Sequence, residues 1–240
     1  VAFCEAVYDG TAAVEGILCR RIDSLEECEQ VWQAGEIPLM VDPAGDCMIE
    51  LYAQGKVAAL VDAILAKKNL GTTKDMAPVT IALGPGFTAG TDCDAVIETM
   101  RGHRLGLVIY EGSAIANTGV PGVIAGYAAE RVIHAPMAGI LHNIAKITDT
   151  VEKGQPIAWI EGKDGKRTEI PASLSGLLRG LIREGYPVTK GFKIADIDPR
   201  LKEYENCFTI SDKARCIAGG VLEAYFSLKK ERQGWTELCM

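Results

Sequence analysis

Three side chains that can exchange protons or hold an anion stand close together near the middle of the chain. Glu98, Arg101 and His103 offer a carboxylate, a guanidinium and an imidazole within one short segment. Such a set can perform acid–base catalysis, or the guanidinium can clamp an acidic ligand. Glu98 and Arg101 can equally form a surface ion pair, and the residue types alone leave both interpretations open.

Two loops that precede this segment have the composition of an anion-binding site. Glycine-rich turns let backbone amides approach an anion closely, and a neighbouring lysine neutralises its charge. The candidate ligand-binding residues are Lys67, Lys68 and Asn69 in the first loop and Gly84, Gly86 and Gly90 in the second. The second loop matches neither a Walker loop nor a full dinucleotide fingerprint, so a tight turn that needs glycine is the alternative.

The elements around these loops alternate between strands and helices. Ser24 and Glu27 form a capping box, which predicts a helix from Leu25 to about Ala34. The other expected elements are a hairpin at 11–21, strands at 37–41, 57–64 and 79–83, and a short helix at 47–54. Strands that alternate with helices imply a parallel, Rossmann-like sheet.

The segment 95–110 allows two local structures. Its β-branched residues favour a hairpin that turns at 101–104, and a helix beginning at Asp92 is the competing possibility. Parallel sheets gather the loops after their strands' carboxyl ends at one edge. We therefore expect the segments 67–69, 84–90 and 98–103 to converge on one cleft that binds an anionic ligand.

The next part of the chain contains the same short unit twice. Ala172 lies 37 residues after Ala135, and the two copies align without a gap at this shift. The identical pairs are Ala135/Ala172, Gly139/Gly176, Leu141/Leu178, Val151/Val188, Lys153/Lys190, Gly154/Gly191, Ile157/Ile194, Ala158/Ala195 and Ile160/Ile197. An internal repeat of short strands, with Gly154 and Gly191 at equivalent turns, predicts a small all-β unit.

The repeated sequence resembles the biotinyl and lipoyl carrier domains over about 65 residues. This resemblance implies a barrel-sandwich hybrid, in which two copies are related by a pseudo-twofold axis. Those carriers attach their cofactor to a lysine flanked by methionines in the hairpin between the halves. Here that hairpin contains Lys163 and Lys166 with no methionine near them in the sequence, so we expect both lysines to be unmodified.

Composition limits the possible partners. A net charge of −7 argues against binding to a nucleic acid backbone, although it leaves room for a small phosphorylated ligand held locally. No apolar run is long enough for a membrane helix and no signal peptide is visible, so we expect a cytoplasmic protein with no membrane partner. The eight cysteines and three histidines lack the spacing of a metal site. Cys93 is the cysteine nearest the expected cleft in sequence, and a lone cysteine is most often simply buried.

The chain ends in a predicted helix that Ser211 can cap. Its apolar positions recur at helical spacing from Ile217 to Leu228, which favours packing against another element. The expected organisation is a Rossmann-like ligand-binding domain at 1–128, a barrel-sandwich hybrid at 129–200, and a C-terminal helix at 201–240 that packs on the α/β domain.

Several motifs together resemble one protein family along nearly the whole chain. They are GPGFTAG at 84–90, VIETMRGH at 96–103, NTGVPG at 117–122, RGL with a glycine at 185, DIDPR at 196–200, ISDKAR at 210–215 and GGVLEA at 219–224. The chain looks like a member of the YqeB family, the accessory proteins of the selenium-dependent molybdenum hydroxylase system. In that family a glycine-rich first unit precedes the point that corresponds to Val1, so the resemblance implies that the sheet lacks its first unit here.

The resemblance implies a role in maturing molybdenum hydroxylases that carry a labile selenium atom. One hypothesis is therefore a maturation factor that binds a molybdopterin-type cofactor or a nucleotide and serves the hydroxylase or its other maturation proteins. The second is an enzyme that acts on a small acid or a nucleotide through Glu98, Arg101 and His103. A third is a carrier domain with a modified lysine.

Overall fold

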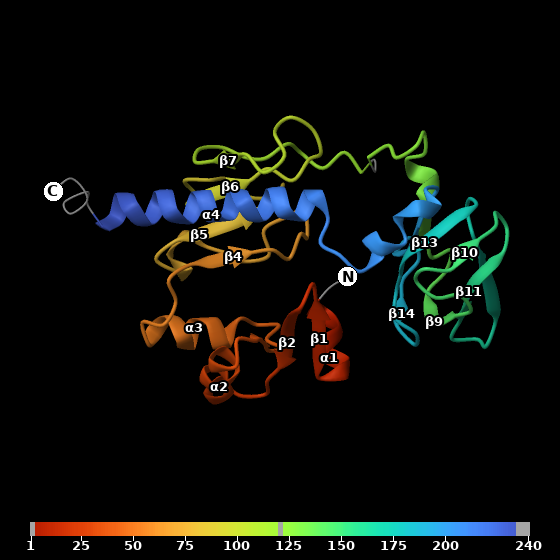
Figure 1. Ribbon diagram of the computed structural model, residues 1–240, viewed down its shortest axis with the longest axis horizontal. Helices are drawn as coiled ribbons and strands as arrows, with labels where there is room; N and C mark the ends of the chain where they lie inside the picture. The colour runs from red at the N-terminus through yellow and green to blue at the C-terminus, as the bar shows by residue number, and fades with distance from the viewer. Residues whose placement is uncertain (1–2, 120–121, 234–240) are drawn as a thin grey trace. The chain divides into compact units, whose positions relative to one another are not determined.

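The computed structural model describes residues 3–119 and 122–233, and it divides the chain into two compact units (Figure 1). The first unit combines residues 1–118 with 210–240, and the second contains residues 119–209. Val1, Val120, Pro121 and Cys239, which the motifs and counts above include, lie outside the described residues. No helix within the described ranges is long and apolar enough to cross a membrane.

The first unit begins with a small three-stranded sheet. Its elements are α1 (Ala6–Asp9), β1 (Thr11–Val14), β2 (Ile17–Arg21), α2 (Cys28–Gln33), β3 (Ile37–Leu39) and α3 (Asp46–Ala53). β1 and β2 form the predicted hairpin, and β3 adds to β2 in parallel. The predicted capping box is present, since Ser24 accepts a hydrogen bond from the backbone and Glu27 reaches back to the Ser24 N–H at 3.0 Å. It starts a 3₁₀ turn at Leu25–Glu27 that leads into α2.

A second sheet of the first unit carries the loops of interest. Its strands lie in the order β4 (Leu60–Asp62), β5 (Thr80–Leu83), β6 (Ala95–Ile97) and β7 (Val108–Ile109). β4, β5 and β6 are parallel, whereas β6 and β7 pair antiparallel. The segment 95–110 therefore adopts the expected hairpin rather than a helix. A three-strand parallel order with one antiparallel edge is compatible with a Rossmann-like sheet, and that classification stays a prediction.

One face of this sheet is covered by α4 (Asp212–Gln233), which contacts β5, β6 and β7 (Figure 1). Ala224 and Leu228 of α4 share a buried cluster with Ile81 and Ile97 of the sheet. Gly220 is buried where α4 meets the chain before β7. A glycine is needed there, because an added Cβ would overlap the Gly106 carbonyl oxygen. The apolar periodicity of the C-terminal segment thus marks the face that packs.

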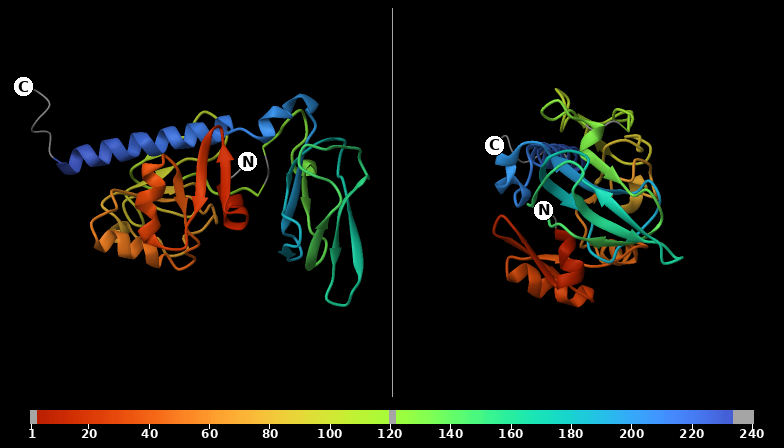
Figure 2. Two further views of the ribbon diagram at one scale, coloured as in Figure 1. Left: turned by 60° about the horizontal axis from the view of Figure 1, so that its bottom comes forward. Right: turned by 90° about the vertical axis from the view of Figure 1, so that its right-hand side faces the viewer.

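The second unit consists of eight strands in two antiparallel sheets (Figure 2). The strands are β8 (Val132–His134), β9 (Gly139–Asn143), β10 (Thr150–Val151), β11 (Pro156–Glu161), β12 (Arg167–Pro171), β13 (Gly176–Leu181), β14 (Pro187–Val188) and β15 (Lys193–Asp198). A shift of 37 residues places β8 to β11 on β12 to β15. The sheet orders are β10-β13-β15-β8 and β12-β11-β9-β14. When each strand of the first sheet is replaced by its equivalent in the other copy, the order becomes β14-β9-β11-β12, which is the second sheet read in reverse.

The repeat is a structural repeat at the level of single hydrogen bonds. The Gly154 N–H donates to the Ala172 carbonyl at 2.8 Å, and the Gly191 N–H donates to the Ala135 carbonyl at 2.8 Å. Both glycines have positive φ, 88° and 84°, as expected for equivalent turns. No α-helix interrupts 132–198, so the predicted all-β repeat is confirmed. Whether it belongs to the barrel-sandwich hybrid class stays a prediction.

The shared residues of the two copies form the core of this unit. Six of the identical pairs belong to one buried cluster: Ala135/Ala172, Leu141/Leu178, Val151/Val188, Ile157/Ile194, Ala158/Ala195 and Ile160/Ile197. Gly139 and Gly176 are shared for a different reason. A Cβ at Gly139 would overlap the Glu161 carbonyl oxygen, and one at Gly176 would overlap the corresponding oxygen of Asp198.

Candidate functional site

The two predicted ligand loops touch each other directly. The Asn69 N–H donates to the Gly86 carbonyl at 3.1 Å. Gly86 has a φ of 109°, and a Cβ there would lie 2.5 Å from the Cα of Lys68. Only glycine allows the backbone of the lysine loop to approach this closely. Gly86 is therefore needed for more than a tight turn, because the close approach of the lysine loop also requires a glycine at this position.

The third segment joins the same edge of the sheet. The Gly84 N–H donates to the Ile97 carbonyl at 2.9 Å, which holds the start of the glycine loop against the end of β6. A Cβ at Gly84 would lie 2.5 Å from the hydroxyl oxygen of Thr99. The structure therefore brings the three predicted segments together at the carboxyl ends of β4, β5 and β6.

A fourth element that the sequence did not reveal completes this cationic cluster, which we define as Lys67, Arg101 and Lys213. Lys213 lies in the first turn of α4. Burial, together with the nearby positive charges of Lys67 and Arg101, lowers the pKa of Lys213, and only Glu98 opposes this effect. Lys67 itself has a φ of 64°, an uncommon backbone conformation for a residue other than glycine. Lys67 and Arg101 thus both lie near enough to Lys213 to act on its charge, in a chain whose net charge is −7.

Glu98 is placed differently from a general base. Its side chain is buried, and its two oxygens accept hydrogen bonds from the Met100 N–H at 2.7 Å and the Ile115 N–H at 2.8 Å. These bonds fix the backbone that carries Arg101. A carboxylate saturated by two backbone donors is well suited to holding the segment in shape and to offsetting the nearby positive charge.

Arg101 and His103 are exposed, and they have different surroundings. The guanidinium of Arg101 donates to both oxygens of Asp212 at 2.8 and 3.0 Å. His103 lies in the turn between β6 and β7, where the Leu105 N–H donates to the Gly102 carbonyl at 3.1 Å. The hydrogen bonds of Glu98 run to the Met100 and Ile115 N–H groups and those of Arg101 run to Asp212, so these bonds do not join Glu98, Arg101 and His103 into one catalytic set.

Two predicted binding residues have structural roles instead. The side-chain oxygen of Asn69 accepts the Gly71 and Thr72 N–H groups at 2.8 Å, so it shapes its own loop. The Gly90 N–H donates to the Cys93 carbonyl at 2.8 Å, just before β6 begins. Gly90 thus lies toward the amino ends of the strands, because the glycine loop crosses from one edge of the sheet to the other.

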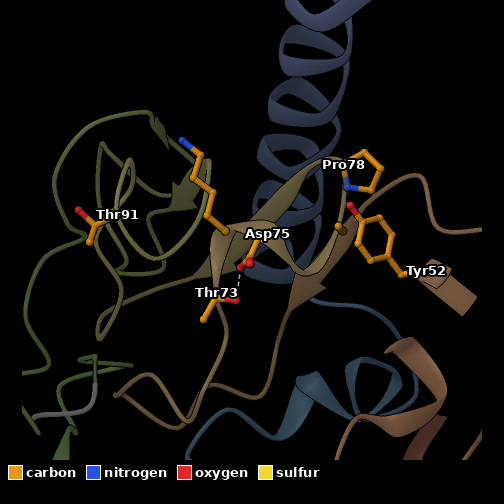
Figure 3. Close-up of a pocket in the computed structure, with 7 residues that line it drawn as sticks. Tyr52, Thr73, Asp75, Pro78 and Thr91 are labelled. Atoms are coloured by element: carbon orange, nitrogen blue, oxygen red, sulfur yellow. Dashed lines mark hydrogen bonds between the residues drawn. The ribbon is translucent and has the colours of Figure 1, made fainter. Parts of the chain in front are cut away.

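A shallow depression of about 500 Å³ lies at the amino ends of β5 and β6 (Figure 3). Five residues just before β5, Thr91 before β6 and Tyr52 of α3 line it; the five are Thr73, Lys74, Asp75, Ala77 and Pro78. Figure 3 shows the hydroxyl of Thr73 turned to Asp75, with which it shares a hydrogen bond of 2.6 Å. The depression is at the opposite end of the strands from the cationic cluster, and ligands of parallel sheets bind at the carboxyl end.

The cysteines offer little to the site. Cys93 is fully buried, and burial raises the pKa of its thiol to about 11, which keeps it protonated and unreactive. Within the described ranges, no group of three histidine, cysteine, aspartate or glutamate side chains has the geometry of a metal site.

The hairpin of the second unit corrects one part of the sequence interpretation. Lys163 and Lys166 lie in the exposed turn between β11 and β12, as expected. A methionine is nevertheless close in space, because the Met137 sulfur accepts a hydrogen bond from the Thr168 hydroxyl at 3.1 Å. Its methyl carbon would lie 2.6 Å from a Cβ on Gly162. The local sequence of the hairpin could not show this methionine, because Met137 comes from an earlier part of the chain.

The comparisons with known proteins address the chain as a whole. No family model matches it. Over 228 residues the chain is 55% identical to the uncharacterized protein YqeB of Escherichia coli K12. It is a homologue of YqeB. The match includes 95% of the chain but only 40% of the length of YqeB, so the chain corresponds to part of that relative. The resemblance to YqeB inferred from the motifs is confirmed at this level.

Solved structures resemble the chain only in part. An aspartoacylase family protein of Mesorhizobium loti is 17% identical, with a TM-score of 0.27, over 29% of this chain and 23% of its own. The ectoine utilization protein EutE of Ruegeria pomeroyi is 18% identical, with a TM-score of 0.26, over 37% of this chain and 27% of its own. Similarity this weak carries no argument about the fold or the function of the YqeB homologue.

Proposed function

We propose that the α/β unit binds a small ligand that carries phosphate groups, and that it does so as part of an accessory factor for selenium-dependent molybdenum hydroxylases. The observation that carries the ligand class is the cationic cluster. Lys67, Arg101 and Lys213 converge beside a glycine loop in an otherwise acidic chain. Burial and the positive charges of Lys67 and Arg101 disfavour the charged form of Lys213, and a bound anion would relieve this cost.

The glycine loop supplies the rest of the proposed site. Gly84 and Gly86 both have positive φ, and their missing Cβ atoms let Thr99 and the backbone of Lys68 pack against the glycine loop. Successive backbone groups in such turns can approach an anion closely. Arg101 has the planar fork that holds two oxygens of one phosphate. A nucleotide or a molybdopterin-type cofactor would supply phosphates of this kind.

The cellular role rests on the motifs and on the homology to YqeB. The hydroxylase, or its other maturation proteins, would be the macromolecular partner, and the cytoplasm the place of action. The alternative of an enzyme that uses Glu98, Arg101 and His103 has less support. Each oxygen of Glu98 already accepts a backbone N–H group, which suits a structural role better than proton transfer.

Isothermal titration with pyrophosphate, adenosine diphosphate and a molybdopterin dinucleotide tests the ligand class. Lys213→Gln should weaken binding of pyrophosphate by about ten- to a hundredfold, because it removes a charge-assisted contact. Lys229→Gln is the matched control, since Lys229 is an exposed lysine of the same helix that lies beside Tyr225 instead of the cluster. Equal affinities for the two variants would exclude the cluster as the site. Arg101→Ala and Lys68→Ala should likewise fold normally and bind more weakly.

The pH dependence of the same titration tests the role of Lys213. An anion stabilises the charged amine, whose pKa in the empty site is lowered from the ordinary value of 10.5. Below its folded pKa Lys213 is already charged and binding is at its strongest. Above that pKa the amine of Lys213 is neutral and must take up a proton when the anion binds. The affinity of the parent for pyrophosphate should therefore begin to fall at a lower pH than the affinity of the Lys213→Gln variant. Identical pH profiles for the parent and the variant would contradict this role.

The cellular proposal requires a separate test. Cells that lack the full-length homologue should lose selenium-dependent hydroxylase activity and regain it when the parent gene is restored. Arg101→Ala and Lys213→Gln should restore it poorly, whereas Lys229→Gln should restore it fully. Full activity in the deletion strain would remove the maturation role while leaving the ligand class intact.

A further inference from the structure

A ligand that reached the cationic cluster would find its arginine already engaged. Two terminal nitrogens of Arg101 donate to the two oxygens of Asp212 at 2.8 and 3.0 Å. Two parallel bonds of this kind are also how a guanidinium holds a phosphate. The carboxylate of Asp212 therefore takes the place on Arg101 that two ligand oxygens would take.

The ion pair is open to exchange with a ligand. The side chain of Arg101 is 48% exposed and that of Asp212 is 72% exposed. Water and salt compete with ion pairs this exposed, so each contributes little to stability. A ligand with a higher negative charge can therefore displace Asp212 at small cost. The released carboxylate can then rotate toward the solvent.

The start of α4 does not depend on this ion pair. Glu15, in the turn between β1 and β2, accepts the Ile210 N–H at 2.8 Å and is bound through both its oxygens by Arg215. The Ser211 hydroxyl accepts the Ala214 N–H at 3.2 Å as a helix cap. Both anchors lie outside the Arg101–Asp212 pair. Release of Asp212 would therefore leave Lys213 in place beside the cluster.

We propose that Asp212 is an internal competitor for the anion at Arg101, so that ligand binding and the Arg101–Asp212 ion pair exclude each other. This inference rests on the proposed function, because it concerns the same site. Without a ligand, Asp212 neutralises Arg101, an exposed cation of the cluster. When a phosphate-bearing ligand binds, its oxygens replace those of Asp212 on the guanidinium, and Glu15 keeps the helix start anchored.

The test is a titration of the whole chain with inorganic pyrophosphate at low ionic strength. Asp212→Asn keeps the shape of the side chain and removes its charge, so it should bind pyrophosphate about two- to fivefold more tightly than the parent. Glu223→Gln is the matched control. It makes the same change in net charge on an exposed residue of the same helix, roughly 16 Å further along at 1.5 Å per residue. A gain for Asp212→Asn that Glu223→Gln does not share supports the proposal, whereas equal gains, or no gain, overturn it.

A double variant separates competition for Arg101 from a general charge effect. In the Arg101→Ala background, Asp212→Asn should no longer increase affinity, because the shared partner is gone. A full gain in that background would overturn the proposal. If Arg101→Ala weakens binding of pyrophosphate while Asp212→Asn binds it as tightly as the parent does, Asp212 is not a competitor, but the proposed ligand class stands. If none of the four proteins binds pyrophosphate, both fall together.

Discussion

Under the 37-residue shift Asp198 corresponds to Glu161, and these two carboxylates have opposite surroundings. Asp198 is fully buried and accepts hydrogen bonds from Arg179 at 2.9 Å and from Arg200 at 2.8 Å. Glu161 has a side chain that is 40% exposed, and its oxygens lie 3.7 Å from the Arg167 Nε and 3.9 Å from a ring nitrogen of His142. Equivalent strand positions thus carry a buried ion network in one half and longer, exposed ion pairs in the other.

The neighbouring positions continue the contrast. Asp196 pairs with Arg131 at 2.9 Å in the second half, and its counterpart in the first half is Trp159. The Trp159 ring stacks on His142, with ring centroids 4.1 Å apart, and the guanidinium of Arg167 lies 4.3 Å from the same ring. One outer face is therefore held by charges and the other by stacked rings.

The difference follows from which residues the two copies share. Most of the identical pairs form the buried cluster or the close contacts of Gly139 and Gly176, and Lys153/Lys190 and Gly154/Gly191 form the equivalent turns. The outward strand positions compared above have no common partner and have diverged. The chain after β15 also covers its own half, since Arg179 lies 3.9 Å from Glu203 and donates to the Asn206 carbonyl at 3.5 Å. The chain after β11 turns into β12 instead and gives no such cover.

The largest expected difference between the halves concerns the two carboxylates. Asp198→Asn should lower the free energy of unfolding of the second unit by roughly 2–3 kcal/mol, because it removes the charge that Arg179 and Arg200 bind at a buried position. Glu161→Gln, the matched change, should stay within about 0.5 kcal/mol. Denaturant-dependent hydrogen exchange of amides in β11 and β15 measures both. Equal losses would mean that the surroundings of the two carboxylates do not differ in energy.

The two equivalent glycines should instead respond alike. Gly139→Ala and Gly176→Ala each force a methyl group onto a carbonyl oxygen, which should cost about 1–3 kcal/mol in either half. Gly180→Ala is the control, because its Cβ would lie 3.5 Å from the nearest atom, an ordinary contact. Thermal unfolding of the three variants measures the effect. Unequal losses at Gly139 and Gly176 would break the symmetry of the backbone.

Asp198 should make the stability of the second unit sensitive to acid. Burial raises the pKa of Asp198, but hydrogen bonds from Arg200 and Arg179 outweigh it and set the pKa at about 2, below the ordinary 3.8. A carboxylate with a depressed folded pKa stabilises the fold above its unfolded pKa, and this contribution disappears as pH falls through the folded value. Roughly 2 kcal/mol should therefore be lost between about pH 4 and pH 2. Unfolding curves of the parent should show this loss, and those of Asp198→Asn should lack it.

The smallest expected effect belongs to the ring face. Arg167→Gln removes the cation above Trp159 together with its exposed ion pair to Glu161 at 3.7 Å, and should cost about 0.5–1 kcal/mol. Lys166→Gln, a neighbouring exposed residue of the same turn, should cost less. The comparison is made from urea midpoints. A larger loss at Lys166 would show that the ring face is not the source of the stabilisation.

Local patterns predicted the parts of the fold that depend on neighbouring residues. The capping box at Ser24, the hairpin at 11–21 and the paired turns at Gly154 and Gly191 all form as expected. The repeat was the strongest prediction, because its identical residues are those that the core constrains. The convergence of the three site segments followed from the rule for parallel sheets.

The missed features depend on contacts between distant parts of the chain. Asp212 pairs with Arg101 across 111 residues, and Lys213 joins the cluster from the same turn of α4. The motif around them was recognised as a family feature, but nothing local tied it to the site. The role of Glu98 was missed for a similar reason, since one of its donors is Ile115 on a later loop.

The exchange of strands between the copies has a consequence for how the second unit comes apart. Each sheet takes two strands from each half, so β8 and β10 of the first copy lie beside β13 and β15 of the second. The unit has the architecture of a strand-swapped dimer whose two chains are joined by the hairpin at 162–166. A protease cut at Lys163 would leave two fragments that hold each other by both sheets. Neither piece could bury its isoleucines without the other, and the nicked unit should keep its shape in solution.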